Sequence, residues 1–191
     1  MNTLLAINWE EQWSAHAPGF REGRAHIPLT HEIDLPLLPG PGFGDSSHPT
    51  TRLMLTLLAP LIPGHEVFDI GCGSGILSVA SAKLGATKVY ACDIDSDALE
   101  HTRKNGEINQ VELAFSPPPP SSKPVILMNM IASEQKEAWG LQKRPFTHLI
   151  TSGILATDKT SYLSFAEENH WQILHEEELE GWMGFVIKEK S

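Results

Sequence analysis

The chain has 191 residues, of which 41% are hydrophobic, and a formal net charge of −10 at pH 7. This length suits one domain with a substantial core and is too short for two ordinary ones. The negative net charge argues against a protein that binds nucleic acid or an anionic membrane through non-specific electrostatics, and it favours basic partners. No apolar run is long enough to span a membrane, and "MNTLLAINWEEQW" lacks the features of a secretory signal, so we expect a cytoplasmic protein.

The chain starts with a lead-in that precedes the main predicted domain. A short helix is expected around Trp9 and Trp13, whose i, i+4 spacing is typical of a stripe packed on a core. Residues 17–41 are rich in proline and glycine and are expected to run as irregular chain. We therefore divide the sequence into a lead-in, residues 1–41, and one domain, residues 42–191.

From residue 65 onward, predicted strands and helices alternate. Strands are expected at 65–70, 87–95, 111–115, 125–132 and 146–156, followed by two closing strands in "WQILHEEE" and "WMGFVIKE". A helical pattern follows each of the first, second, fourth and fifth strands. Near-continuous apolar strands alternating with helices predict an α/β fold with a doubly wound, mostly parallel, seven-stranded, Rossmann-like sheet. The four prolines at 117–120 are expected to form a stiff surface connection.

The cysteines and histidines predict neither a disulfide nor a metal site. Cys72 and Cys92 are the only cysteines, and both fall in strand-and-turn patterns, which favours reduced, structural thiols. The nine histidines are scattered without metal-ligand spacing, so no bound metal is expected.

The chemistry concentrates in "VFDIGCGSG". An apolar strand ends there, and Gly71, Gly73 and Gly75 form a turn that leads into a helix. In a doubly wound fold, ligands lie beyond this first turn, where backbone N–H groups and a helix N-terminus attract a negative group. Asp93 follows Gly71 by 22 positions, at the end of the next strand, where a carboxylate suits the hydroxyls of a ribose.

Two cofactors fit such a turn. A dinucleotide prefers G-x-G-x-x-G, but Ile76 or Ser78 stands at the last glycine position. Asp69, just before the turn, would repel a pyrophosphate but suits the ammonium group of S-adenosylmethionine. S-adenosylmethionine is therefore the preferred cofactor.

The stretch "GFGDSSHPTT", residues 42–51, fits neither a helix nor a strand. Proline is tolerated in the first turn of a helix, so Pro49 and Thr51 are placed at the start of the helix that continues as "RLMLTLLAP". Its positive end and the Thr51 hydroxyl are expected to receive the carboxylate of the methionine moiety. Gly42 and Gly44 are candidate hinges of a lid, and Phe43 is its candidate apolar cover. The alternative is that the polar side chains only cap the helix.

These motifs together resemble a known family. "VFDIGCGSGILSVASAKLGATKVYACDIDSDAL" is similar to the glycine motif and ribose strand of class I methyltransferases. "LLPGPGFGDSSHPTT", "MNMIAS" and "SGILAT" resemble the loop, fourth-strand and fifth-strand motifs of the PrmA family, which methylates large-subunit ribosomal protein eleven. The likeness runs from about residue 36 to 191.

The resemblance implies an S-adenosylmethionine-dependent N-methyltransferase that acts on lysine side chains or the α-amine of a basic ribosomal protein. It implies a catalytic Asn129, placed where cofactor, methyl group and substrate meet. The amine must be unprotonated, and the side-chain carbonyl of Asn129 can hold it without restoring a charge. The full set of residues expected at the cofactor is Phe43, Thr51, Asp69, Gly71, Gly73, Asp93, Ile94 and Asn129.

Three departures from the family pattern leave alternatives open. Relatives normally carry an N-terminal recognition domain, for which the residues before the loop are too few. Asp45-Ser46-Ser47 replaces T-G-T in the loop, and "SPPPP" stands where relatives have a polar segment near the adenine. The alternatives are methylation of another protein or a small amine, or a diverged, non-catalytic methyltransferase-fold binding module.

Overall fold

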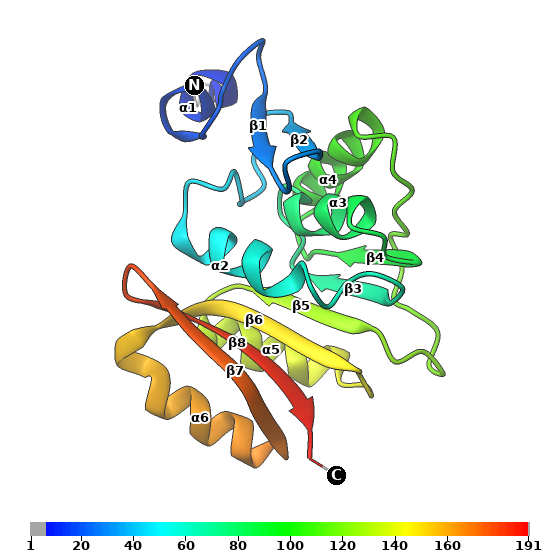
Figure 1. Ribbon diagram of the computed structural model, residues 1–191, viewed down its shortest axis with the longest axis vertical. Coiled ribbons are helices and arrows are strands. Elements are labelled where there is room, and N and C mark those ends of the chain that lie inside the picture. The colour runs from blue at the N-terminus through cyan, green and yellow to red at the C-terminus, as the bar shows by residue number, and fades with distance from the viewer. Residues whose placement is uncertain (1–6, 191) are drawn as a thin grey trace, which may run out of the picture.

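The computed structural model describes residues 7 to 190 and contains one large sheet (Figure 1). Its six strands lie in the order β4-β3-β5-β6-β8-β7. Their bounds are β3 Glu66–Ile70, β4 Lys88–Cys92, β5 Val125–Asn129, β6 His148–Leu155, β7 Trp171–Leu179 and β8 Trp182–Glu189. The first four strands in this order are parallel, whereas β8 is antiparallel to both β6 and β7. The predicted mostly parallel α/β class is confirmed.

Helices cover both faces of the sheet. They are α2 Pro49–Leu58, α3 Ile76–Lys83, α4 Ser96–Ile108, α5 Ala132–Gln142 and α6 Lys159–Glu168, with the 3₁₀ turn η1 Ala156–Asp158 before α6. Val125 and Leu127 of β5 belong to the buried cluster under α2 and α3, while Ile126 and Met128 belong to the cluster under α5 and α6. This alternation explains why the strand is apolar at every position. Among residues 7 to 190, no helix combines the length and apolar character that crossing a membrane requires.

The expected strand at 111–115 holds the seventh position of the sheet through a single bridge. Ala114 pairs in parallel with Tyr90, donating its N–H to Val89 and accepting from the N–H of Ala91, both at 2.9 Å. The segment then runs into the prolines at 117–120. Proline has no N–H to donate, so the ladder does not extend.

The lead-in is more regular than its composition predicts. It contains α1 Trp9–His16 and an antiparallel pair of strands, β1 Ala25–Pro28 and β2 Asp34–Leu37. The expectation of irregular chain over 17–41 was therefore wrong, because two short strands satisfy one another's backbone groups there. In the expected helix, Trp13 is buried and Trp9 stays partly exposed.

The lead-in docks on α4. The N–H of Leu38 donates to Oδ1 of Asn105, and the Leu38 carbonyl oxygen lies 2.7 Å from Nε2 of His101. Leu35 and Leu37 are fully buried in the cluster that also contains residues of α2 and α3. The boundary at residue 41 stays a prediction, and the shared cluster indicates that the two parts fold together.

Candidate active site

A glycine turn follows β3 and lies directly against the loop of residues 42–48. Gly73 has a φ of +57°, and a Cβ atom there would lie 2.6 Å from the carbonyl oxygen of Phe43. A Cβ atom on Gly42 would lie 2.3 Å from the carbonyl oxygen of Gly73. The N–H of Ser74 donates to the Phe43 carbonyl at 2.9 Å. Glycine at both positions therefore permits this approach of two backbones.

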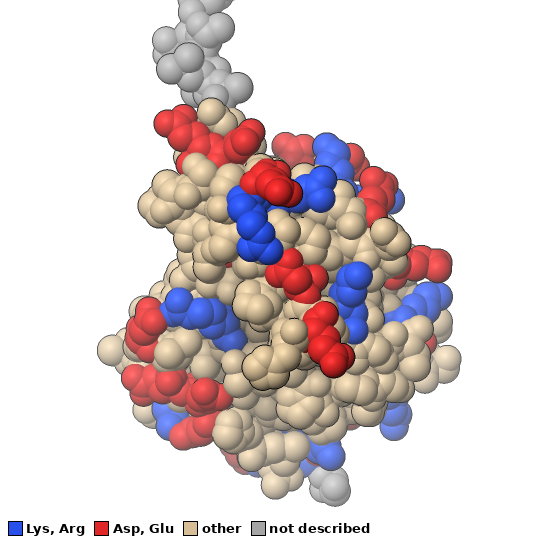
Figure 2. All heavy atoms as spheres, turned by 45° about the horizontal axis from the view of Figure 1, so that its top comes forward, with Lys and Arg blue, Asp and Glu red and all other residues tan. Residues whose placement is uncertain are grey.

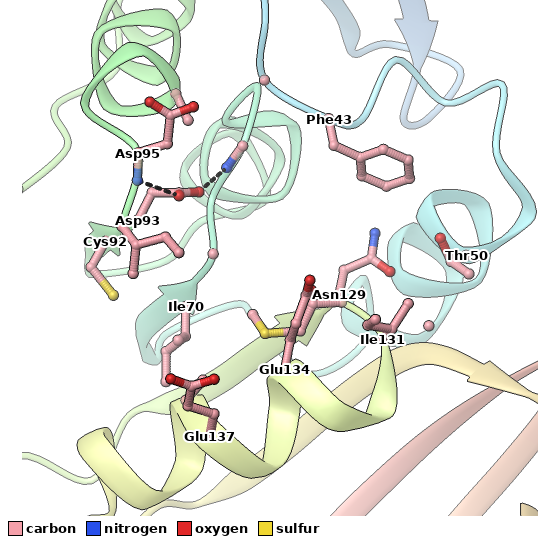
Figure 3. A pocket seen from close by; sticks show the side chains of 18 of the residues that line it. Phe43, Thr50, Ile70, Cys92, Asp93, Asp95, Asn129, Ile131, Glu134 and Glu137 are labelled. Atoms are coloured by element: carbon pink, nitrogen blue, oxygen red, sulfur yellow. Dashed lines mark hydrogen bonds between the residues drawn. The ribbon is translucent and has the colours of Figure 1, made fainter. Parts of the chain in front are cut away.

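Asp93 follows β4 and is anchored to the glycine turn (Figure 3). Its Oδ2 accepts the N–H of Gly73 at 3.0 Å, and its Oδ1 accepts the N–H of Asp95 at 3.0 Å. Each carboxylate oxygen has a further lone pair, so both can still accept a hydrogen bond from a ligand.

Asp69 lies beneath the glycine turn and not in the cavity that the turn borders. Side chains alternate along β3, so Ile70 faces the cavity while Asp69 faces α3. The Asp69 carboxylate is 1% exposed and accepts from the Ser78 hydroxyl at 2.6 Å. Burial raises the pKa of Asp69 to about 7, although the hydrogen bond from Ser78 acts in the opposite direction and lowers it. The expected contact between Asp69 and a ligand ammonium thus has no support from this geometry.

Asn129 ends β5 and contacts the first turn of α2. Its Nδ2 donates to Oγ1 of Thr51 at 3.4 Å, a long hydrogen bond. Thr51 is fully buried, and it is Thr50 that lines the cavity. Thr51 therefore touches Asn129, and not the cavity into which its hydroxyl was expected to project.

The start of α2 and the start of β8 form an aromatic wall. His48 caps α2, with Nδ1 accepting from the N–H of Thr50 at 3.3 Å. Its ring lies edge-on to Phe43 and to Trp182, with centroid separations of 5.5 and 5.0 Å. Burial, followed by the charge of Arg52, lowers the pKa of His48. The lowered pKa favours the neutral ring, and the N–H that Thr50 donates to Nδ1 favours the tautomer with its proton on Nε2.

Arg52 joins the 42–48 loop to the turn between β7 and β8. Its guanidinium donates to the Ser47 carbonyl at 3.3 Å and pairs with Glu180 in that turn. Asp45 folds back on the same loop, accepting the N–H of Ser47 at 2.9 Å. The added carboxylate at position 45 is therefore engaged within the loop and is not among the cavity residues.

A cavity of about 630 Å³ opens at the carboxyl ends of β3, β4 and β5 (Figure 3). Six of the eight predicted cofactor residues line it, namely Phe43, Gly71, Gly73, Asp93, Ile94 and Asn129. The lining residues that the sequence did not predict include His48, Thr50, Met130, Ile131, Glu134, Glu137, Leu141 and Trp182. No residue of 111–124 lines the cavity, so the proline run lies away from it.

Of these unpredicted residues, His48 is marked by a local sequence signal and Trp182 is not. His48 directly precedes a proline at the first position of a helix, which marks it as the capping residue. Trp182 has no comparable local signal, because its place depends on the register of β8 against β6.

The lining is apolar with an acidic bias. Asp93, Asp95, Glu134 and Glu137 line the cavity, and none of the residues found there is a lysine or an arginine. Ile94 presents a fully exposed apolar side chain. On the face shown in Figure 2, lysine and arginine side chains lie in separate groups among acidic ones. The cavity therefore suits a ligand that combines an apolar part with a positive charge.

The fold and this site together define a class of protein. A mostly parallel α/β sheet, a glycine turn after β3 and an acid after β4 form the arrangement of class I methyltransferases. The family model described as "Ribosomal protein L11 methyltransferase (PrmA)" matches residues 5–190. The chain belongs to this family and is a methyltransferase, which confirms the resemblance drawn from its motifs.

Individual relatives agree with the family match. The ribosomal protein L11 methyltransferase of Legionella pneumophila (strain Corby) is 36% identical over 100% of this chain and 71% of that protein. That of Dictyoglomus thermophilum is 34% identical over 96% of this chain and 67% of that protein. Among solved structures, a ribosomal protein L11 methylase from Lactobacillus delbrueckii subsp. bulgaricus aligns with a TM-score of 0.74 and 25% identity, over 87% of this chain and 99% of that one.

A more distant structure shows the shared fold alone. The Pyrococcus abyssi tRNA (uracil-54, C5)-methyltransferase, in complex with S-adenosyl-L-homocysteine, aligns with a TM-score of 0.61 and 16% identity. The alignment covers 88% of this chain and 44% of that one.

Proposed function

We propose that the protein transfers methyl groups from S-adenosylmethionine to amines of ribosomal protein L11, on lysine side chains or the α-amine, in the cytoplasm. The observation that carries the proposal is that Asn129 lines the same cavity as Asp93 and the glycine turn. The names of the relatives state L11 as their substrate. A net charge of −10 favours a basic protein partner over direct contact with nucleic acid.

The residues present fit this cofactor. Asp93 has lone pairs left for the ribose hydroxyls, and exposed Ile94 offers an apolar surface for the adenine. Gly71 and Gly73 line the cavity and carry no side chain, so a ligand can approach the backbone of the glycine turn closely. Phe43 is half-exposed at the cavity and would cover the bound molecule.

The chain's own residues would orient the amine. When bound, S-adenosylmethionine supplies an electrophilic methyl group for in-line attack by an uncharged amine. Because Asn129 donates through Nδ2 to Thr51, its Oδ1 remains available to accept from the amine N–H. His48 accepts through Nδ1 from Thr50 and carries its proton on Nε2, so it acts as wall and helix cap and not as a proton acceptor.

The test is transfer of labelled methyl groups. Purified protein and labelled S-adenosylmethionine are incubated with purified L11, with free lysine, and with an extract of cells that lack this protein. We expect label in L11, resolved by mass, and a large loss of rate for Asn129→Ala with a smaller loss of cofactor affinity.

Other outcomes would identify the alternatives. Label in a different protein or in free lysine would replace L11 as the acceptor. Cofactor binding by calorimetry without any transfer would indicate a non-catalytic binding module. Absence of cofactor binding would remove the proposal altogether.

A further inference from the structure

One buried side chain of α5 joins the end of β5 to the neighbouring strand β6, beside Asn129. Gln135 is fully buried, and its Nε2 donates to the carbonyl oxygens of Met130 at 2.7 Å and Ser152 at 2.8 Å. Met130 directly follows Asn129, and Ser152 directly precedes Gly153, which also lines the cavity. A single amide thus links the carboxyl end of β5 to Ser152, which lies within β6 beside that end.

The other end of the same amide is equally constrained. Oε1 of Gln135 accepts from the hydroxyl of Thr151 at 2.6 Å and from that of Tyr162 at 2.8 Å. Burial raises the pKa of Tyr162, so its hydroxyl keeps the proton that it donates. Both donors and both acceptor sites of the amide are therefore used, which fixes its orientation.

The backbone that Gln135 holds is tightly packed. A Cβ atom on Gly153 would lie 2.1 Å from the carbonyl oxygen of Met130, and β6 carries an irregularity in its pairing with β8 at this point. A Cβ atom on Gly71 would lie 2.5 Å from Cε of Met130. Met130 is therefore confined between the glycine turn and β6. A small displacement of the Met130 backbone would move Asn129 relative to the glycine turn and to β6.

We propose that Gln135 is a positioning residue for methyl transfer, because its two donated bonds fix the backbone at Met130 and with it the direction of the Asn129 amide. The inference rests on the proposed function, in which Asn129 orients the amine. Gln135 itself is not among the residues that line the cavity. The competing account is that the buried network only stabilises the fold.

Two variants separate these accounts. Gln135→Met removes the donors to both carbonyls at similar volume, and Gln135→Glu is a second variant in case Gln135→Met does not fold. Tyr162→Phe is the matched control, since it removes one bond from the same amide and leaves both donated bonds intact. Single-turnover transfer, cofactor affinity, thermal midpoint and hydrogen exchange of residues 130–134 are measured for each.

The Gln135 variants are expected to slow single-turnover transfer by about tenfold or more, since misplacement of about 1 Å can cost about a hundredfold. Their cofactor affinity should stay within about threefold, because Asp93 and the glycine turn are untouched. Tyr162→Phe should lower the thermal midpoint yet transfer at a rate within about twofold of the parent. Residues 130–134 should exchange faster in the Gln135 variants alone.

A folded Gln135 variant with the parent's transfer rate would overturn the inference. So would a Tyr162→Phe protein that loses rate as much as Gln135→Met. If the parent itself fails to methylate L11, the proposed function falls. The exchange measurement still tests the inference separately, because unchanged exchange at 130–134 would show that Gln135 does not hold this backbone and would overturn it on its own.

Discussion

Two aspartates at the ends of neighbouring strands lie in opposite environments. Asp93 faces the cavity and keeps lone pairs for a ligand, whereas Asp69 is buried against Ser78. Both residues were assigned to the cofactor from their positions after apolar strands. Which aspartate faces the cavity depends on the alternation of side chains along each strand and on where the strand ends. The exact end of a strand is difficult to predict from sequence.

Replacing Asp93 with alanine should weaken binding of S-adenosylmethionine by about 2–4 kcal/mol, because charge-assisted hydrogen bonds to the ribose are lost. Calorimetry measures the affinity, and thermal melting checks the fold. Asp95→Ala is the control, since Asp95 also lines the cavity but its carboxylate caps α4. Equal affinity in parent and Asp93→Ala would show the ribose assignment to be wrong.

The pKa of Asp69 makes a prediction about stability and pH. Its folded value of about 7 lies above the ordinary value of 3.8, so the folded state holds a proton that the unfolded state releases between these values. The contribution of Asp69 to the free energy of unfolding is therefore fully present below pH 3.8 and is lost as pH rises through about 7. Asp69→Asn should remove this dependence. The thermal midpoint of the variant minus that of the parent should therefore increase as pH rises from about 4 to 7. A constant difference between the two midpoints over this range would contradict the assignment.

At the scale of elements, the 42–48 loop and the β7–β8 turn form one wall of the cavity although they are far apart in the sequence. Arg52 bonds to both, through the Ser47 carbonyl and Glu180. Exposed ion pairs contribute only about 0–1 kcal/mol to stability. The effect of the Arg52–Glu180 pair should therefore appear in the local motion of the 42–48 loop and much less in overall stability.

Glu180→Gln is expected to speed hydrogen exchange in residues 43–48 while the thermal midpoint changes little. Glu176→Gln is the matched control, because Glu176 lies in the same hairpin and pairs with Lys159 instead. Faster exchange of the loop in both variants, or in neither, would show that Arg52 does not couple these two elements.

The elements that the sequence predicted well are those with strong periodicity. The buried strands β3 and β5 and the helix starting at Pro49 appear where their apolar patterns and the proline place them. The pairing of β1 with β2 was missed, since strands of four residues that contain proline have no usable period. Trp182 and Gln135 were missed for a related reason, because each acquires its role only when distant strands come into register.

At the scale of the whole molecule, the net charge of −10 is expected to attract a basic protein substrate by long-range electrostatics. The screening length falls from about 10 Å at 0.1 M salt to about 3 Å at 1 M. The KM for L11 should therefore rise with salt, while the transfer rate at saturating L11 and the affinity for cofactor change much less. A KM that is independent of salt would show that general attraction plays no part in substrate capture.

The docking of the lead-in on α4 has a consequence for synthesis of the chain. Leu38 and its partner Asn105 are separated by 67 positions, a stretch that takes roughly 3–13 s to translate at typical rates. The lead-in is made first, and it cannot complete its docking until α4 has emerged. A ribosome that stalls before His101 and Asn105 would therefore leave the backbone of Leu38 without its α4 partners and the lead-in only partly docked, within reach of chaperones and proteases.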